Sequence, residues 1–184
     1  MSLLPARPRA IEGTWIRHVP HRANLLGRSS TPSDGRWQRG GIIPALYLAD
    51  TVATATAEWY RSLAEWGLSP QDHVPYDHHR WRVELELADL SDTERLHDVM
   101  LQEPRPSRQT WPAYQRVGEQ LWREGWAGLI APSAAHPGSL IVCVFASAWP
   151  PAGCTPLDAS TVKRIPPPRA AWQREHKPAA SRVL

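Results

Sequence analysis

The pattern of apolar and polar positions predicts five strands, two helices and one short helical turn. The clearest strand is RWRVELEL, residues 80–87, where Trp81, Val83, Leu85 and Leu87 alternate with charged residues. Strict alternation is typical of a strand with one buried and one solvated face. The other strands are predicted at residues 14–19, 44–49, 126–133 and 140–145, and the turn at 89–99.

The two helices are predicted from apolar residues at helical spacing. The first follows Asp50, a good N-cap residue, and ends at Gly67. Glu58 lies about 100° from the centre of its apolar stripe, at an edge where a side chain can border a cleft. The second runs from Thr110 to about Glu124. These elements indicate an α+β protein in which the strands of one sheet are wrapped by helices.

The length of 184 residues is enough for one domain with short extensions. We expect the domain at residues 14–149, after an N-terminal extension at residues 1–13. Residues 150–184 contain WPPAG and RIPPPR, so we expect an irregular, proline-rich C-terminal extension. The stretch 20–44 lacks periodicity, and a loop that long is uncommon unless it works at a site.

Composition and charge narrow the classes of function. With 42% hydrophobic and 21% charged residues and a net charge of +3, the chain is typical of a globular protein. No apolar run approaches the roughly 20 residues that span a bilayer. No signal peptide is evident, so we expect a cytoplasmic protein without membrane contact. The arginines form no basic stripe, which argues against direct nucleic-acid binding.

Metal and disulfide chemistry are not indicated either. Cys143 and Cys154 form neither a disulfide framework nor a metal motif. Cys143, inside the apolar run LIVCVF, is expected to pack as a small hydrophobic residue. His78 and His79 are expected in a solvated loop, with no metal.

Five stretches, in this order and spacing, resemble the RES domain family, which is named for arginine, glutamate and serine. Its members are usually toxins of bacterial toxin–antitoxin pairs. The resemblance covers residues 14–149, and the spacing from Arg36 through Tyr47 to Glu58 is its most specific part. The stretches are WIRH (Arg17, His18), GRWQ (Arg36, Trp37), ALYLA (Tyr47), TAEWY (Glu58) and GLIAPSA (Ser133).

Two positions depart from the family's pattern. The family often has an aromatic residue after the first arginine, where this chain has His18. Gln38 stands where asparagine is common. Because histidine can still stack or donate a hydrogen bond, the change at position 18 affects the detail of substrate binding more than the class of activity.

The resemblance implies a fold similar to ADP-ribosyltransferases and an activity that consumes NAD⁺. NAD⁺ is then the substrate, and no cofactor or metal is expected. The implied partner is a helix-turn-helix, Xre-like antitoxin, and whether the chain forms a homo-oligomer stays open. By the resemblance, the catalytic residues are Glu58 and Arg17, and the residues that bind NAD⁺ are Arg36, Tyr47, Ser133, His18 and Trp37.

These residue types suit the chemistry of NAD⁺. The planar fork of arginine holds phosphate oxygens bidentately, and a tyrosine ring suits the flat cationic nicotinamide. Cleavage of the nicotinamide–ribose bond develops oxocarbenium charge, which a nearby carboxylate stabilises. A cleft rimmed by Arg17, Arg36 and Arg39 would also attract a carboxylate of the antitoxin, so we expect the antitoxin to compete with NAD⁺.

Several alternatives stay open from the residues alone. Glu58 could simply form an i,i+3 ion pair with Arg61. The acceptor of the ADP-ribosyl group could be phosphate or water, which makes the enzyme an NAD⁺ phosphorylase or glycohydrolase. It could also be a protein, which makes the enzyme an ADP-ribosyltransferase. A catalytically inactive RES-fold binding module is the non-enzymatic alternative.

Overall fold

The structure, a computed structural model, describes residues 4–24, 26 and 33–167, and six strands and three α-helices lie in this part of the chain. The strands are β1 (Arg7–Pro20), β2 (Ala45–Ala49), β3 (Tyr76–Asp89), β4 (Gly128–Pro132), β5 (Leu140–Phe145) and β6 (Cys154–Val162). The helices are α1 (Val52–Glu65), α2 (Thr93–Asp98) and α3 (Trp111–Arg123), with 3₁₀ turns η1 (Pro70–His73) and η2 (Arg108–Thr110).

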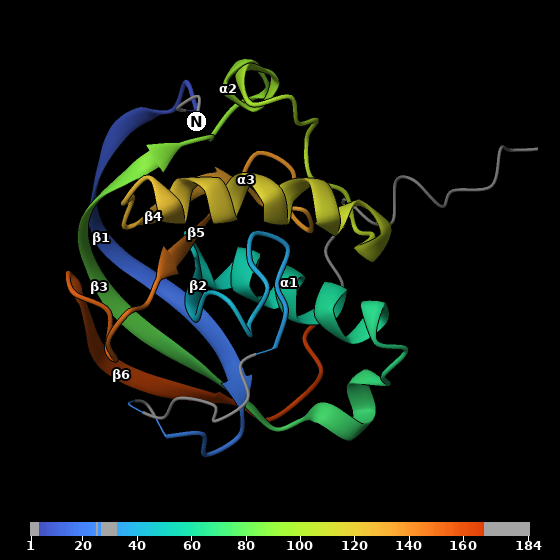
Figure 1. The fold of residues 1–184 in the computed structure, drawn as a ribbon. Coiled ribbons are helices and arrows are strands. Elements are labelled where there is room, and N and C mark those ends of the chain that lie inside the picture. Colours follow the sequence, from blue (N-terminus) through green and yellow to red (C-terminus); the bar gives the residue numbers. More distant parts are fainter. Residues whose placement is uncertain (1–3, 25, 27–32, 168–184) are drawn as a thin grey trace, which may run out of the picture.

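The strands form one strongly curved mixed sheet in the order β1-β2-β5-β4-β3-β6 (Figure 1). β1 also pairs along its whole length with β3, so the first five strands in this order close into a ring. β6 extends the sheet beside the N-terminal half of β3. Among the strands in the described residues, only β3 and β4 pair in parallel. The predicted α+β class is confirmed.

Two narrow seams join a long sheet (β1, β3, β6) to a short sheet (β2, β5, β4). β3 meets β4 only through Ala88 and Asp89. β1 meets β2 at the single pair Ile16–Ala49, beyond which the two strands are no longer paired. The ring is therefore open beside Arg17 and His18.

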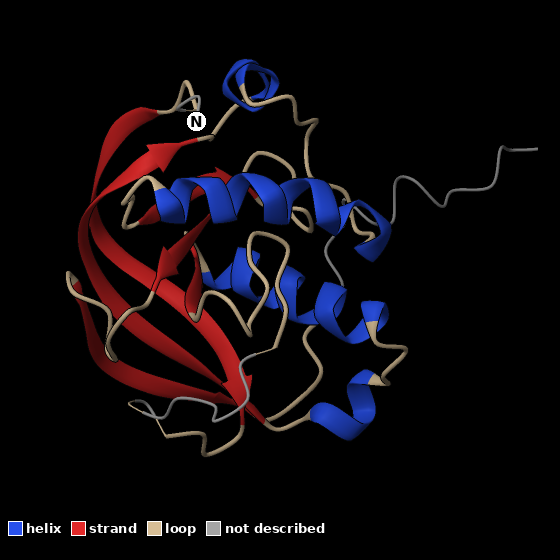
Figure 2. Cartoon of the chain, in the orientation of Figure 1, coloured by secondary structure: helices blue, strands red, loops and turns tan. Residues whose placement is uncertain are grey.

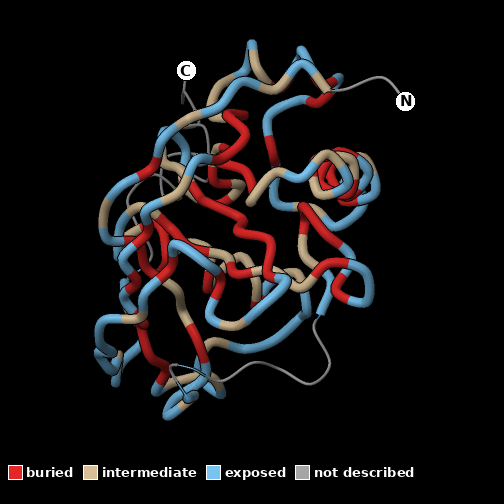
Figure 3. The backbone as a smooth tube through the Cα atoms, turned by 60° about the vertical axis from the view of Figure 1, so that its left-hand side comes forward, coloured by how far each residue is buried: buried red, intermediate tan, exposed pale blue. Residues whose placement is uncertain are grey.

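Alternation along the strands divides the core in two. Leu46 and Leu48 of β2 pack with Trp81 and Val83 of β3 between the two sheets. Tyr47 points to the other face and packs with the helix-side core, as its alternation with the two leucines predicts. Helices α1 and α3 cover that outer face (Figure 2). The buried backbone accordingly runs through the middle of the molecule, with exposed loops around it (Figure 3).

Helix α3 fixes the loop that precedes β2. A Cβ at Gly118 would overlap the carbonyl of Trp37, so only glycine lets this loop lie directly on the helix. Gln115, one turn earlier, donates from Nε2 to the carbonyl of Gly35 at 2.9 Å. The segment carrying Arg36 is thereby held against α3.

The start of α1 differs by one residue from the prediction. Thr51, not Asp50, is the N-cap, and its hydroxyl accepts from the N–H of Thr54 at 3.1 Å. Asp50 instead accepts from the N–H of Leu140 at 2.8 Å, which ties the helix start to β5.

The expected extensions are wrong where the structure describes them. Residues 7–13 belong to β1, and Cys154–Val162 forms β6 instead of an irregular tail. Residues 168–184 lie outside the described part. The expected solvated loop at His78 and His79 is also wrong, because both residues lie in β3 and are buried between β1 and β6.

Cys143 is buried in β5, as expected. None of the helices in the described residues is long and apolar enough to cross a membrane.

Candidate active site

A cavity of about 310 Å³ lies where β1 and β2 separate. Its wall comes from β1, the loop before β2, β2 itself and α1. Six of the seven site residues predicted from sequence line it: Arg17, His18, Arg36, Trp37, Tyr47 and Glu58. Ser133, the seventh, lies behind this wall. Residues far apart in the chain are thus brought together at the open seam.

Arg17 and His18 both reach the cavity although neighbouring residues of a strand point to opposite faces. The open seam explains this, because both faces of β1 border the gap. The Arg17 guanidinium centre lies 5.9 Å from the ring centroid of Trp149, which also lines the cavity. His18 lies on the other face, within electrostatic reach of Glu58.

Glu58 is held by both of its carboxylate oxygens. The hydroxyl of Ser133 donates to Oε1 at 2.6 Å, and Nε of Arg61 donates to Oε2 at 2.6 Å. The side chain is 13% exposed and lines the cavity. The ion pair with Arg61 that was open from sequence therefore exists, and it holds the carboxylate at the cavity wall.

Ser133 contacts Glu58 from the loop that follows β4. Its Oγ accepts from the N–H groups of Ala135 at 3.1 Å and His136 at 3.0 Å. With those two acceptor contacts filled, the hydroxyl proton is directed to the Glu58 carboxylate. The described contacts make Ser133 a positioning residue instead of a lining residue.

The net effect of this environment is a lowered pKa of the Glu58 carboxyl. Burial alone would raise that pKa, but the Arg61 charge and the hydrogen bonds from Ser133 and Arg61 together outweigh it. Glu58 is therefore a carboxylate at neutral pH, charged although only 13% of its side chain is exposed.

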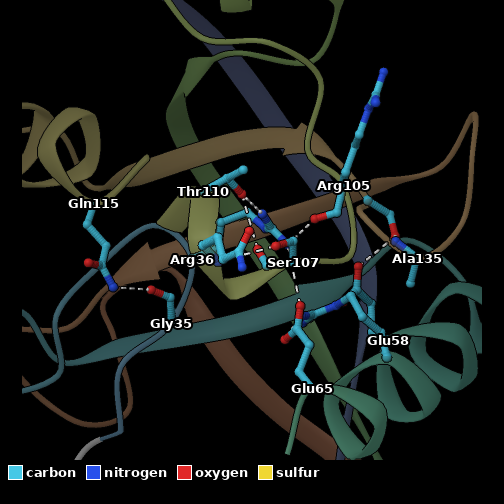
Figure 4. Close-up of polar contacts among 12 residues, drawn as sticks. Gly35, Arg36, Glu58, Glu65, Arg105, Ser107, Thr110, Gln115 and Ala135 are labelled. Carbon is cyan, nitrogen blue, oxygen red and sulfur yellow. Dashed lines mark hydrogen bonds and ion pairs between the residues drawn. The ribbon is translucent and has the colours of Figure 1, made fainter. Parts of the chain in front are cut away.

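Arg61 extends the network along α1. Its second nitrogen, Nη1, pairs with Glu65, so one guanidinium joins carboxylates at positions i−3 and i+4 of the helix. Glu65 lies 3.7 Å from Nη2 of Arg36. Arg36 donates to the carbonyl of Arg105 at 2.8 Å and to Oγ1 of Thr110 at 3.3 Å (Figure 4). Arg36 is 6% exposed and fixes the loop before β2 to α1 and η2.

Tyr47 is fixed by the same loop. Its hydroxyl accepts from the N–H of Trp37 at 3.0 Å and donates to Oε1 of Gln38 at 3.3 Å. That Oε1 also accepts from the N–H of Gly35 at 2.6 Å. A Cβ at Gly35 would overlap the Tyr47 hydroxyl, so the glycine makes room for the tyrosine. Gln38, where the family commonly has asparagine, still supplies the side-chain amide of this turn.

Trp37 and Arg39, in the loop before β2, make contacts that the sequence did not predict. The Trp37 ring packs edge-on against Tyr114 in the helix-side core, with centroids 5.0 Å apart, although the residue borders the cavity. Arg39 does not line the cavity. It pairs with Glu119 on α3 at 2.5 and 2.7 Å, so the expectation that it rims the cleft is wrong.

The cavity wall also contains charged residues that the sequence did not single out as functional. From sequence, Arg61 is only a candidate ion-pair partner of Glu58, and Glu65 has no predicted role. Glu58 and Glu65 stand at positions i−3 and i+4 from Arg61, and this spacing predicts that one arginine pairs with both carboxylates. Within the described residues, no group of three or more His, Cys, Asp or Glu side chains could hold a metal ion.

Comparison with known proteins decides the family. The sequence matches the RES domain over residues 9–173, which is most of the chain. The chain belongs to the RES domain family. The match begins before and ends beyond residues 14–149, in agreement with the strands found at both ends of that range.

Curated relatives of this RES domain include the NAD(+) phosphorylase MbcT of Mycobacterium tuberculosis (strain H37Rv) and of Mycobacterium bovis. Each is 26% identical over 124 residues, which cover 66% of this chain and 67% of the relative. The crystal structure of the M. tuberculosis MbcT–MbcA toxin–antitoxin complex contains a chain of the same fold. That likeness has a TM-score of 0.69 and 21% identity, and it covers 91% of this chain and 90% of the other.

We predict that His18 makes this RES domain sensitive to acid. Desolvation lowers the pKa of its imidazole from 6.5 to about 4, although the Glu58 charge opposes the shift. The unfolded chain therefore binds this proton more readily, and the His18 contribution to stability is lost as the pH falls from 6.5 to about 4. In urea unfolding at pH 7 and pH 4.5, His18→Asn should lose less stability than the wild type.

The matched control for that comparison is His97→Asn, because His97 is exposed on α2. It should follow the wild-type pH dependence. If the His18 variant and the wild type lose equal stability on acidification, the imidazole is not held neutral by the fold.

Proposed function

We propose that this RES domain is a toxin that depletes cytoplasmic NAD⁺ by cleaving the nicotinamide–ribose bond, with inorganic phosphate as the acceptor. The observation that carries the proposal is an ionised carboxylate, Glu58, fixed at the wall of a cavity that also holds Arg17 and Tyr47. Membership of the RES family and the likeness to a protein named NAD(+) phosphorylase support the same chemistry.

Each residue has a role that follows from its place. Glu58 stabilises the oxocarbenium charge that develops on the ribose as the bond to nicotinamide breaks. Tyr47 offers a ring face to the nicotinamide, which leaves as a neutral molecule with the electron pair of the bond. Among the described residues the Arg17 guanidinium has no hydrogen-bond or ion-pair partner, so it can hold a phosphate group of the substrate.

The charge state of Glu58 favours phosphate over water as the acceptor. Water must lose a proton when it attacks, and a carboxylate with a lowered pKa is a weak base for that step. An oxygen of the phosphate dianion can bond to the ribose carbon without any proton transfer. The product is then ADP-ribose 1-phosphate together with free nicotinamide.

Glu58→Gln should keep the fold and remove most turnover. The change is nearly isosteric but deletes the negative charge, and we expect kcat to fall about 10²- to 10³-fold. The control is Glu86→Gln, an exposed glutamate on the solvated face of β3, which should retain wild-type kcat. Nicotinamide release is measured on variants whose urea unfolding matches the wild type. A folded Glu58→Gln protein with wild-type turnover would leave Glu58 only a structural partner of Arg61.

We also propose that a helix-turn-helix, Xre-like antitoxin restrains the enzyme by placing a carboxylate in the cavity. The structural relative was crystallised as a toxin–antitoxin complex, and the unpaired charge of Arg17 would attract such a group. Inhibition of the purified complex should then be relieved by excess NAD⁺, as measured by nicotinamide release across an NAD⁺ titration. Inhibition that no NAD⁺ concentration relieves would exclude competition at this cavity.

A further inference from the structure

A cluster of two tryptophans and one arginine lies at the C-terminal end of α1. Trp66 is the C-cap of α1, Arg108 lies in η2, and Trp111 is the first residue of α3. The Arg108 guanidinium centre is 3.9 Å from the ring centroid of Trp66 and 5.0 Å from that of Trp111. Both indole rings belong to residues that line the cavity holding Glu58.

The cluster is not accounted for by core packing. Trp66 is 53% exposed, whereas Trp59, one α1 residue that does pack in the core, is 4% exposed. Trp111 is buried, but its Nε1 has no hydrogen-bond partner among the described residues. An exposed indole stacked with a guanidinium, beside a second tryptophan that lines the same cavity, is suited to a planar aromatic ligand.

The position of the cluster along α1 fits the order of the groups in the dinucleotide. From Glu58 to Trp66 the helix axis advances about 12 Å, at about 1.5 Å per residue. Arg61 lies between them on the same helix and lines the cavity, as does Arg36 from the neighbouring loop. The order along this wall is the Glu58 carboxylate, the two arginines with Glu65 paired to both, and the tryptophans. NAD⁺ has the reacting ribose, the pyrophosphate and the adenosine in the same order.

We propose that Trp66, Arg108 and Trp111 form the subsite that binds the adenine base of the dinucleotide. The base stacks on this cluster, while Glu58 faces the ribose at the other end of the cavity. This inference rests on the proposed function for its substrate. It adds the group by which the site distinguishes a dinucleotide from a nicotinamide mononucleotide.

The test compares two substrates that share the reacting bond. NAD⁺ carries the adenylate, and nicotinamide mononucleotide does not. Trp66→Ala should lower kcat/KM for NAD⁺ roughly tenfold, mainly through KM, because one base–aromatic stack is lost. It should leave kcat/KM for nicotinamide mononucleotide within about twofold, and Trp66→Phe should retain most NAD⁺ activity. The control is Leu68→Ala, since Leu68 is also exposed at this end of α1 but does not line the cavity.

A binding measurement separates this inference from the proposed function. In calorimetric titration with ADP, the wild type and Leu68→Ala should bind alike, and Trp66→Ala roughly tenfold more weakly. Unchanged ADP affinity in folded Trp66→Ala, or no ADP binding by the wild type, would overturn the subsite. Equal losses for the two nicotinamide substrates would overturn it too. If the wild type cleaves neither substrate, the proposed function fails, and the ADP titration still decides whether the subsite exists.

Discussion

The central constraint in this protein is a largely desolvated carboxylate, Glu58, that must stay charged. Burial disfavours the charged form of Glu58, and the Arg61 guanidinium and the Ser133 hydroxyl outweigh that effect by contacting one oxygen each. The two partners come from different parts of the fold, one from the next turn of α1 and the other from the end of β4. The position and the charge of Glu58 therefore depend on the helix docking correctly on the short sheet.

The sheet topology explains why a cavity exists beside this carboxylate. β1 pairs with β3 over its whole length but meets β2 at one residue pair only. The ring thus stays intact on one side and opens on the other, next to Arg17 and His18. The described part of the loop before β2 forms one wall of the cavity, held by Arg36 contacts to Thr110 and Arg105 and by the close approach of Trp37 to Gly118. The same contacts that stabilise the fold also shape the site.

The pattern of apolar and polar residues predicted the helices and strands that show a clear local periodicity. It failed for a strand that forms only because it pairs with a distant part of the chain. The alternation of Trp81 to Leu87 located the middle of β3, and apolar periodicity located α1. β6 was missed because it is an edge strand, mostly exposed, and contains Pro156. Without β6, the histidines that it covers resembled a solvated loop.

The site divides in the same way. The order and spacing of the residues that resemble the RES family placed Glu58, Arg17 and Tyr47 in one site, and in the structure all three line one cavity. No spacing rule could place Ser133 behind Glu58 or direct Arg39 to Glu119, because these contacts depend on how β4 and α3 pack. No sequence pattern indicated that Trp66 and Trp111 form a cluster, because both contact Arg108, which is distant from Trp66 in the chain.

In the proposed mechanism Glu58 is a charge stabiliser and a weak base, so the reaction requires an acceptor that needs no deprotonation. The most direct measurement is the product of NAD⁺ cleavage, followed by mass spectrometry with and without inorganic phosphate at constant ionic strength. We expect ADP-ribose 1-phosphate and nicotinamide when phosphate is present, and little cleavage when it is absent. Free ADP-ribose formed at the same rate in both conditions, or ADP-ribose attached to protein, would contradict the account.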